Sequence, residues 1–265
     1  DQTGIPADLI FVIQGDSDLI KTGGGTGGSR SVTVQNNATL ATVATMTQKF
    51  TAFLSEEMGV DASAIEFDDE RFRADGSNLT PTMLEVAEMA RTAGRNDLLV
   101  HEEHAKLEAR SFPNGAHISE VVIDPETGVV TTDRYFVIDD FGNLINPVLA
   151  EGQVHGGVVQ GIGQALTERV VYDEDGQLLT ATFMDYAMPR ADDVPNISFT
   201  SVPVPSTANI MGMKGCGEAG TVGALAAVAN AVQDALWDHG VRQADMPFTP
   251  HRVWELLQDA PIAAE

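Results

Sequence analysis

In the first third of the chain, the pattern of hydrophobic and polar positions predicts a strand in one segment and a helix in another. A short run of branched residues at 8–14 predicts a strand, and residues 39–57 carry apolar side chains at helical spacing. The acidic stretch 59–79 that follows predicts surface loop with one short strand near Ile65. A glycine-rich loop at 15–31 separates the predicted strand from the predicted helix.

Four further helices are predicted from apolar spacing and from Thr-Pro starts. Thr80-Pro81 predicts an N-cap and first residue for a helix that stops near Gly94. Residues 150–170 read as helical despite several glycines, and residues 221–239 as a helix of small side chains. A last helix is expected to start at Thr249-Pro250.

Strands are expected in the middle of the chain. Residues 98–141 are rich in branched side chains that partly alternate, with PETG as a turn between two runs. Pro147 breaks this pattern, and residues 178–188 predict another strand. Helices combined with antiparallel hairpins predict an α+β fold with mixed sheets and packed helices.

Composition narrows the class of protein. With 265 residues, 43% of them hydrophobic, the chain can form one large domain or two small ones with a sizeable core. No apolar run reaches the roughly 18 residues that cross a bilayer, and the N-terminus has no signal-peptide pattern. The chain lacks an initiator Met, so we expect a piece of a longer or processed polypeptide.

Charge and cysteine content exclude other classes. The formal charge of −24 argues against nucleic-acid binding, which needs clustered Lys and Arg. It fits an acidic soluble surface, with a salt-tolerant source as an alternative. A single cysteine, Cys216, excludes an internal disulfide and an iron–sulfur cluster held by this chain alone, and agrees with a cytoplasmic location.

The glycine-rich loop matches two nucleotide-binding motifs only in part. Gly23, Gly25 and Gly28 satisfy GxGxxG, but the expected helix starts about ten residues later and positions 46–53 hold no acid for a ribose. Ser29 follows Gly28 where a phosphate-binding P-loop needs Lys. An unrelated nucleotide-binding domain is therefore a weak alternative.

What remains in this loop is exposed backbone with polar side chains. The hydroxyls of Thr26, Ser29 and Ser31 and the guanidinium of Arg30 could line an anion-binding nest. A flexible surface loop is the other interpretation, and composition does not choose between them.

A second candidate site is KGCGEAG at 214–220, where Glu218 stands among three glycines just before a small-residue helix. Glycines allow close approach to the backbone, and a Glu in such a place can act as a general base. The alternative is a Glu that merely favours the first turn of a helix.

A third candidate is EGQVHGGVVQGIGQAL at 151–166. Glycines in a helix cost roughly 1 kcal/mol each relative to Ala, so Gly157 and Gly161 indicate close packing against another backbone or a ligand. Gln160 lies one turn after Gly156. No second His or Cys stands at ligand spacing from His155, which favours a hydrogen-bonded structural role for it over a metal ligand.

Adjacent aspartates occur three times, at 68–69, 139–140 and 192–193. Such pairs are more typical of turns and solvated faces than of catalytic dyads, and only Asp139 has neighbours that suggest burial.

Together these segments resemble one family. The order GGGTGGSRS, RYFVIDDFGNLINPVLAEGQVHGGVVQGIGQAL, FMDYAMPRADDVP and IMGMKGCGEAGTVGALAAVANA is similar to the C-terminal half of the molybdopterin-binding subunit of xanthine oxidase-type molybdenum hydroxylases. The likeness is greatest to the carbon monoxide dehydrogenase large-subunit and aldehyde oxidoreductase branch. It covers nearly the whole chain, so residues 1–265 are expected to be a partial molybdopterin-binding region.

The resemblance implies site residues and cofactors. It implies a molybdenum ion held by a pterin, usually the cytosine dinucleotide form, with no metal ligand from this chain. Glu218 is then the active-site base, in a dry pocket, and Gln160 a cofactor contact near the metal. The loop contacts to the cofactor fall on Thr26, Gly27, Gly28, Ser29, Arg30 and Ser31.

The resemblance also implies an activity and partners. The reaction is oxidation of an aldehyde, a nitrogen heterocycle or carbon monoxide, with water as the oxygen donor and electrons leaving through [2Fe-2S] and FAD subunits. Further cofactor contacts and a substrate-facing loop precede this region in the family, so the rest of the large subunit, or a complementary subunit, is expected to be needed. The alternative function is a non-catalytic domain or assembly subunit of the same fold without bound cofactor.

Overall fold

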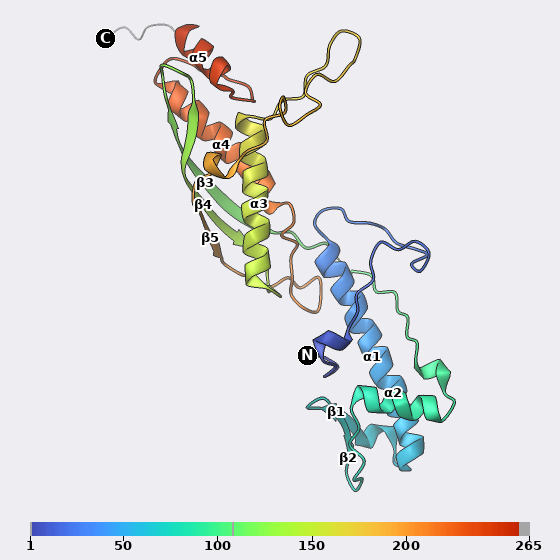
Figure 1. Ribbon diagram of the computed structural model, residues 1–265. Coiled ribbons are helices and arrows are strands. Elements are labelled where there is room, and N and C mark those ends of the chain that lie inside the picture. Colours follow the sequence, from blue (N-terminus) through green and yellow to red (C-terminus); the bar gives the residue numbers. More distant parts are fainter. Residues whose placement is uncertain (1, 108, 260–265) are drawn as a thin grey trace. The chain divides into compact units, whose positions relative to one another are not determined.

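The chain folds into two compact units in a computed structural model that describes residues 2–107 and 109–259 (Figure 1). The first unit comprises the described residues of 1–26 and 33–108. The second comprises 27–32 and the described residues of 109–265. The glycine-rich loop is therefore divided, with its last residues belonging to the second unit.

The first unit is built on one long helix. Helix α1 (Ser31–Met58), whose first two residues belong to the second unit, packs with the hairpin β1 (Ile65–Asp68) and β2 (Arg71–Ala74) and with α2 (Met83–Thr92). Short 3-10 turns lie at Ala7–Leu9, Ala62–Ala64 and Asn96–Leu98. Its buried core is aromatic and aliphatic: Phe50, Phe53, Leu54, Ile65, Phe72, Met83, Val86, Ala90 and Leu98.

Two predictions about this unit were wrong at their boundaries. α1 begins at Ser31, not near Thr39, so a helix does open directly after the glycine-rich loop. α2 begins after Thr82, because Thr82 and Glu85 form a reciprocal capping box with Thr82 Oγ1 accepting the Glu85 N–H at 3.3 Å. The short strand expected near Ile65 is confirmed, with β2 as a partner that had not been predicted.

The strand predicted at 8–14 was wrong. Ala7–Leu9 form a single 3-10 turn, and Phe11 and Val12 are 86% and 81% exposed. A strand needs a neighbour to pair its backbone, and none is recorded for this run among the described residues. The glycine-rich loop consequently follows no strand, which still argues against a dinucleotide-binding unit.

The second unit has a three-stranded sheet covered on one face by helices. β3 (Asn114–Ile123) and β4 (Val130–Asp140) form the antiparallel hairpin predicted for this region, and β5 (Ile197–Ser201) joins β4 in parallel, in the order β3-β4-β5. Helices α3 (Pro147–Leu166) and α4 (Ala219–Trp237) lie against the sheet, with α5 (Pro250–Asp259) beyond them (Figure 1). A 3-10 turn lies at Ala191–Asp193.

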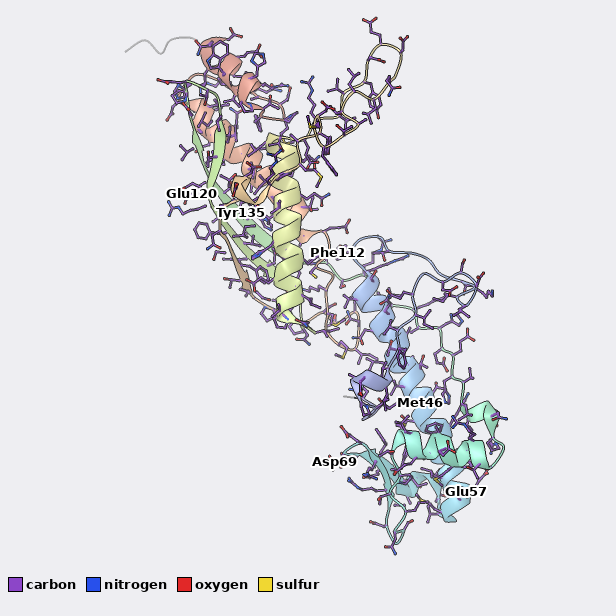
Figure 2. All side chains as sticks on the ribbon, in the orientation of Figure 1. Met46, Glu57, Asp69, Phe112, Glu120 and Tyr135 are labelled. Atoms are coloured by element: carbon purple, nitrogen blue, oxygen red, sulfur yellow. The ribbon has the colours of Figure 1, made fainter. Side chains whose placement is uncertain are left out.

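The side chains of β4 alternate between the core and the exposed face. Tyr135, Val137 and Asp139 point into the layer beneath the helices, whereas Phe136 and Ile138 are partly exposed on the opposite face. Tyr135 and Glu120 are labelled on this sheet in Figure 2. The unit's core is formed by these inward residues with the facing sides of α3 and α4.

Helices α3 and α4 touch through glycine. A Cβ on Gly157 would lie 2.9 Å from the Thr221 nitrogen, and one on Gly220 would lie 2.5 Å from the Val154 oxygen. A Cβ on Gly161 would come within 2.6 Å of the Ala224 Cβ. The predicted close backbone packing at Gly157 and Gly161 is thus confirmed, with another helix as the neighbour.

Some of the remaining predictions for this unit are wrong and others are confirmed. Pro147 opens α3 at its first turn, with Asn146 as N-cap accepting the Leu149 N–H at 3.2 Å, so it does not simply break the pattern. Residues 178–188 are not a strand, because Thr182 organises local turns in which its carbonyl accepts from Asp185 and Tyr186. β5 was not predicted. The α+β class with mixed sheets is confirmed.

Candidate functional site

The segment that carries Glu218 is fastened to the end of β4. Lys214 donates its backbone N–H to the Phe141 carbonyl at 2.8 Å, and its ammonium group binds the Asp140 carboxylate. Asp140 Oδ1 also accepts the backbone N–H groups of Gly142 (2.9 Å) and Val204 (2.8 Å). Burial acts to raise the pKa of Asp140, but the Lys214 and backbone hydrogen bonds outweigh it and hold that pKa below its usual value.

Both acids at 139–140 are buried. Asp139 is 2% and Asp140 9% exposed, so the burial suggested for Asp139 is confirmed and the solvated face expected for Asp140 was wrong. A buried carboxylate requires hydrogen-bond or ionic partners, and Asp140 has them in Lys214 and two backbone amides.

Ser29 and Glu218 form the central contact of the candidate site. Within the second unit, the Ser29 hydroxyl donates to Glu218 Oε2 at 2.6 Å and accepts the Glu218 backbone N–H at 3.0 Å. One hydroxyl thus holds both the backbone and the carboxylate of the residue at the N-cap position of α4. The glycine-rich loop and the KGCGEAG segment, separated by 189 positions, meet at this residue pair.

The glycines beside Glu218 make room for Ser29. A Cβ on Gly215 would lie 2.1 Å from the Ser29 backbone carbonyl oxygen, and one on Gly217 would lie 3.2 Å from the Ser29 hydroxyl oxygen. Ser29 itself has a φ of 57°, a left-handed conformation that is uncommon for a residue with a side chain. The close neighbour indicated by these glycines is therefore part of the same chain.

Helix α3 contributes two amide side chains to the same region. Gln160 Oε1 accepts the Thr221 hydroxyl at 3.0 Å, one turn into α4, and the same hydroxyl lies 3.1 Å from the Gly157 carbonyl. Gln153 Nε2 donates to the Gly217 carbonyl at 2.8 Å. Gln160 thus lies against the helix turn that follows Glu218.

The other predicted loop residues are distributed between the units. Gly27, Gly28 and Arg30 are exposed in the second unit, and Ser31 is the first residue of α1. Thr26 belongs to the first unit. The structure therefore joins Ser29 to Glu218 directly and places Gln160 beside the start of α4.

The accessible surface near this contact offers room and neutral donors. A Cβ added at Gly27, Gly28 or Gly156 would meet nothing within 4 Å. Glu218 and Gln160 are exposed, so the dry pocket expected around Glu218 is not formed by the described residues. Open space beside glycine backbone, a hydroxyl and an amide suits a flat polar cofactor with anionic groups.

Cys216 and His155 lie in the two segments that carry Glu218 and Gln160. Burial is the main cause that raises the pKa of the Cys216 thiol above its usual value, so the thiol stays protonated. His155 Nε2 is buried without a hydrogen bond to the described residues, so the hydrogen-bonded role expected for His155 is not seen at that nitrogen. Among residues 2–107 and 109–259 no cluster of three His, Cys, Asp or Glu could hold a metal ion.

Sequence reasoning missed a buried polar cluster beneath α4. His117 on β3 lies between Tyr135 and Asp139 on β4, with its Nδ1 2.9 Å from the Tyr135 hydroxyl and its Nε2 3.5 Å from Asp139 Oδ1. A polar residue at an inward position of a strand, repeated on the paired strand, is the signal that could have found it.

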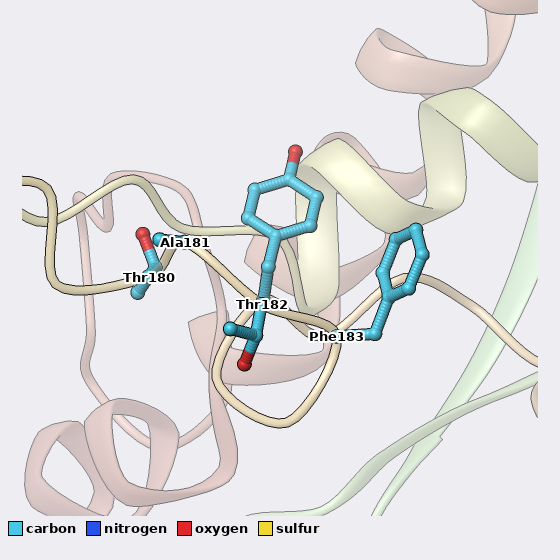
Figure 3. Close-up of a pocket in the computed structure, with 5 residues that line it drawn as sticks. Thr180, Ala181, Thr182 and Phe183 are labelled. Carbon is cyan, nitrogen blue, oxygen red and sulfur yellow. The ribbon is translucent and has the colours of Figure 1, made fainter.

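A cavity of about 370 Å³ lies elsewhere, in the loop that follows α3 (Figure 3). It is lined by Thr180, Ala181, Thr182, Phe183 and Tyr186. The predicted site residues do not line it, so it is not part of the Ser29–Glu218 region. No helix in the described part of the chain is long and apolar enough to cross a membrane.

Comparison with known proteins places the chain in a family. Residues 1–195 match the family model described as molybdopterin cofactor-binding domain. The chain is 32% identical over 260 residues to the 6-hydroxypseudooxynicotine dehydrogenase complex subunit gamma of Paenarthrobacter nicotinovorans, covering 96% of this chain and 33% of that protein. It is 33% identical to the carbon monoxide dehydrogenase large chain of Afipia carboxidovorans, covering 96% of this chain and 32% of that one.

A solved structure of a related enzyme gives the same result as the sequence comparison. A reconstituted CO dehydrogenase from Oligotropha carboxidovorans superimposes with a TM-score of 0.85 at 32% identity, covering 98% of this chain and 33% of that chain. The chain thus spans about a third of the length of these relatives. It is homologous to subunits of molybdopterin-dependent oxidoreductases and belongs to the molybdopterin cofactor-binding domain family, within the large subunits of the xanthine oxidase type.

Proposed function

We propose that this chain supplies the base and part of the cofactor-binding surface of a molybdenum hydroxylase. The observation that carries the proposal is the Ser29–Glu218 contact, because it joins the glycine-rich loop to the one carboxylate of the KGCGEAG segment. A Glu that only favoured a helix start would need no partner from a distant loop.

The cofactor would bind over the open surface beside this contact. Gly27, Gly28 and Ser31 would offer backbone N–H groups, Arg30 a guanidinium, and Ser29 and Gln160 polar side chains. Thr26 remains a cofactor contact implied by the family resemblance alone. The glycine positions where an added Cβ meets nothing support this placement. The bound molybdopterin, with cytosine dinucleotide as the expected form, supplies the redox chemistry.

Glu218 would accept a proton during the reaction. The Ser29 hydroxyl holds its Oε2, which orients the carboxylate and leaves the second oxygen as the proton acceptor. Gln160 and Gln153 fix the backbone on either side through Thr221 and Gly217. Covering this surface with cofactor and further protein would exclude water and strengthen these interactions.

Oxidation of a small carbon substrate is the reaction that this arrangement supports. An aldehyde, a nitrogen heterocycle or carbon monoxide are the candidate substrates, with water as the oxygen donor. Iron–sulfur and FAD subunits would receive the electrons, and the rest of the large subunit would complete the site. A cytoplasmic location remains a prediction from composition.

The test is Glu218→Gln in the complete enzyme. We expect kcat to fall by roughly 10²- to 10⁴-fold while bound molybdenum stays at the level of the unchanged enzyme, because only the base is lost. Glu174→Gln, on an exposed loop, is the matched control and should leave kcat unchanged. Full activity of Glu218→Gln would refute the base assignment.

Metal analysis separates this function from the non-catalytic alternative. The complete protein is purified with its partner subunits and its molybdenum and pterin are measured. A stoichiometric content supports the proposal, whereas a stable assembly without either would support a domain that keeps the fold and binds no cofactor.

A further inference from the structure

A histidine that the proposed mechanism does not use lies beneath α4, the helix whose N-cap residue is Glu218. His117 is on β3, and its side chain is 6% exposed. We propose that His117 is a positioning residue, which sets the height of α4 over the sheet and thereby the position of Glu218 relative to Ser29. The inference rests on the proposed function for its catalytic consequence, but the geometry stands without it.

The histidine is held from below by two residues of β4. Its Nδ1 lies 2.9 Å from the Tyr135 hydroxyl, and the two rings meet edge to face at 84°. Its Nε2 lies 3.5 Å from Asp139 Oδ1, and the Asp139 side chain is 3% exposed. Burial, followed by the Asp139 charge, raises the pKa of Tyr135, so its hydroxyl keeps its proton for the hydrogen bond with His117.

Two glycines pack against this group of side chains, Gly223 against His117 and Gly115 against Asp139. A Cβ on Gly223 of α4 would lie 2.5 Å from Cγ, Cδ2 and Nε2 of the His117 ring. A Cβ on Gly115 of β3 would lie 1.8 Å from Asp139 Oδ1. Because the ring is rigid and the strand lies directly behind Asp139, neither His117 nor Asp139 has room to retreat.

This group of side chains acts on the candidate site through a short stretch of helix. Gly223 is five positions after Glu218, and the Val222 N–H binds the Glu218 carbonyl at 3.0 Å. Thr221, which binds Gln160, lies between them. Lifting α4 from the His117 ring would therefore move the Glu218 carboxylate away from the Ser29 hydroxyl, which now lies at 2.6 Å.

A residue that only stabilised the fold would behave differently. Its loss would lower the unfolding temperature, and restoring stability by any route would restore function. A positioning residue changes turnover in proportion to the displacement of the helix, and a size-compensating second change reverses the effect.

The experiment uses four variants of the complete enzyme: Gly223→Ala, His117→Ala, the two together, and Ala226→Gly. Ala226 is exposed on α4, so Ala226→Gly weakens the same helix without touching His117 and serves as the matched control. The measurements are kcat, KM, bound molybdenum, unfolding temperature and amide hydrogen exchange of residues 216–222.

For Gly223→Ala we expect kcat to fall roughly 10- to 100-fold, with KM and molybdenum content nearly unchanged and faster exchange at 216–222. The double variant should recover most of the lost kcat and slow the exchange again, because the methyl group added to the helix then occupies space vacated by the ring. Ala226→Gly should lower the unfolding temperature and leave kcat and this exchange unchanged.

Several outcomes would overturn the proposal. Normal kcat and exchange in Gly223→Ala, or no recovery in the double variant, would each do so. If Gly223→Ala does not fold, His117→Ala alone decides, since normal kcat and exchange in that variant refute a positioning role. Amide exchange does not depend on turnover, so it tests the positioning role even if Glu218→Gln proves fully active and the proposed function fails.

Discussion

The ammonium group of Lys214 lies against the carboxylate of Asp140, and the two side chains are only 10% and 12% exposed. These residues are 74 positions apart, and Lys214 is four positions before Glu218. The pair therefore ties the segment that carries the proposed base to the end of the central strand.

Removing the cation should destabilise the protein strongly. Lys214→Met would leave the Asp140 carboxylate buried beside two backbone amides but without its counter-charge, and we expect a loss of about 3 kcal/mol in the free energy of unfolding. Urea unfolding checks this value. Lys106→Met, at an exposed position, should change stability by less than about 0.5 kcal/mol, and an equal effect of both variants would contradict a special role for the pair.

The stability of the first unit should depend on pH through His101. Both ring nitrogens of His101 are buried without hydrogen bonds to the described residues, and the ring lies edge-on to Phe50. Burial, followed by the positive charge of Lys49, lowers the pKa of His101 below its usual value. Below roughly pH 6.5 the unfolded chain therefore binds a proton that the folded unit resists, and stability falls as the pH decreases.

This prediction is checked by thermal unfolding between roughly pH 7.5 and pH 5. His101→Phe should unfold at a temperature that changes less with pH over this range than that of the unchanged protein. His104→Phe removes an exposed histidine and should keep the original pH dependence. Parallel curves for His101→Phe and the unchanged protein would show that His101 does not titrate with unfolding.

Two glycines of α3 should respond in opposite ways to the same substitution. Gly161→Ala would bring a methyl within 2.6 Å of Ala224 Cβ and 2.9 Å of the Leu225 nitrogen, and should cost about 1–3 kcal/mol of stability by forcing the helices apart. Gly152→Ala meets nothing within 4 Å and should gain up to about 1 kcal/mol from helix propensity. Chemical unfolding of both variants tests the helix contact, which similar values would contradict.

Elements with a strong and local pattern could be predicted from the sequence. The β3–β4 hairpin follows from two alternating runs around PETG. Helix α4 follows from its helical run of small residues, and α5 follows from its Thr-Pro start and helical spacing. The runs at 8–14 and 178–188 have strand-like composition, but the first has no recorded partner among the described residues and the second has only an isolated bridge between Leu178 and Tyr172. Composition reports a preference for strand, whereas a strand forms only where another backbone is available.

The roles of Ser29, Gln160 and Glu218 come from the family resemblance and stay predictions. The spacing of these residues does not indicate that the Ser29 hydroxyl contacts Glu218, or that Gln160 accepts a hydrogen bond from the Thr221 hydroxyl. His117 was missed because a single histidine in an alternating strand carries no motif. Its role depends on Asp139 and Gly223, which approach it only in the folded sheet and helix.

The 189-residue separation between Ser29 and Glu218 also has a consequence for biosynthesis. A ribosome releases the loop of Ser29 long before it makes α4, so the carboxylate gains its orienting hydroxyl only when the chain closes one of its longest loops. Contacts of such long range form late in folding. Binding of the proposed cofactor at this surface would then require that α4 has already been made and that Glu218 has reached the loop of Ser29.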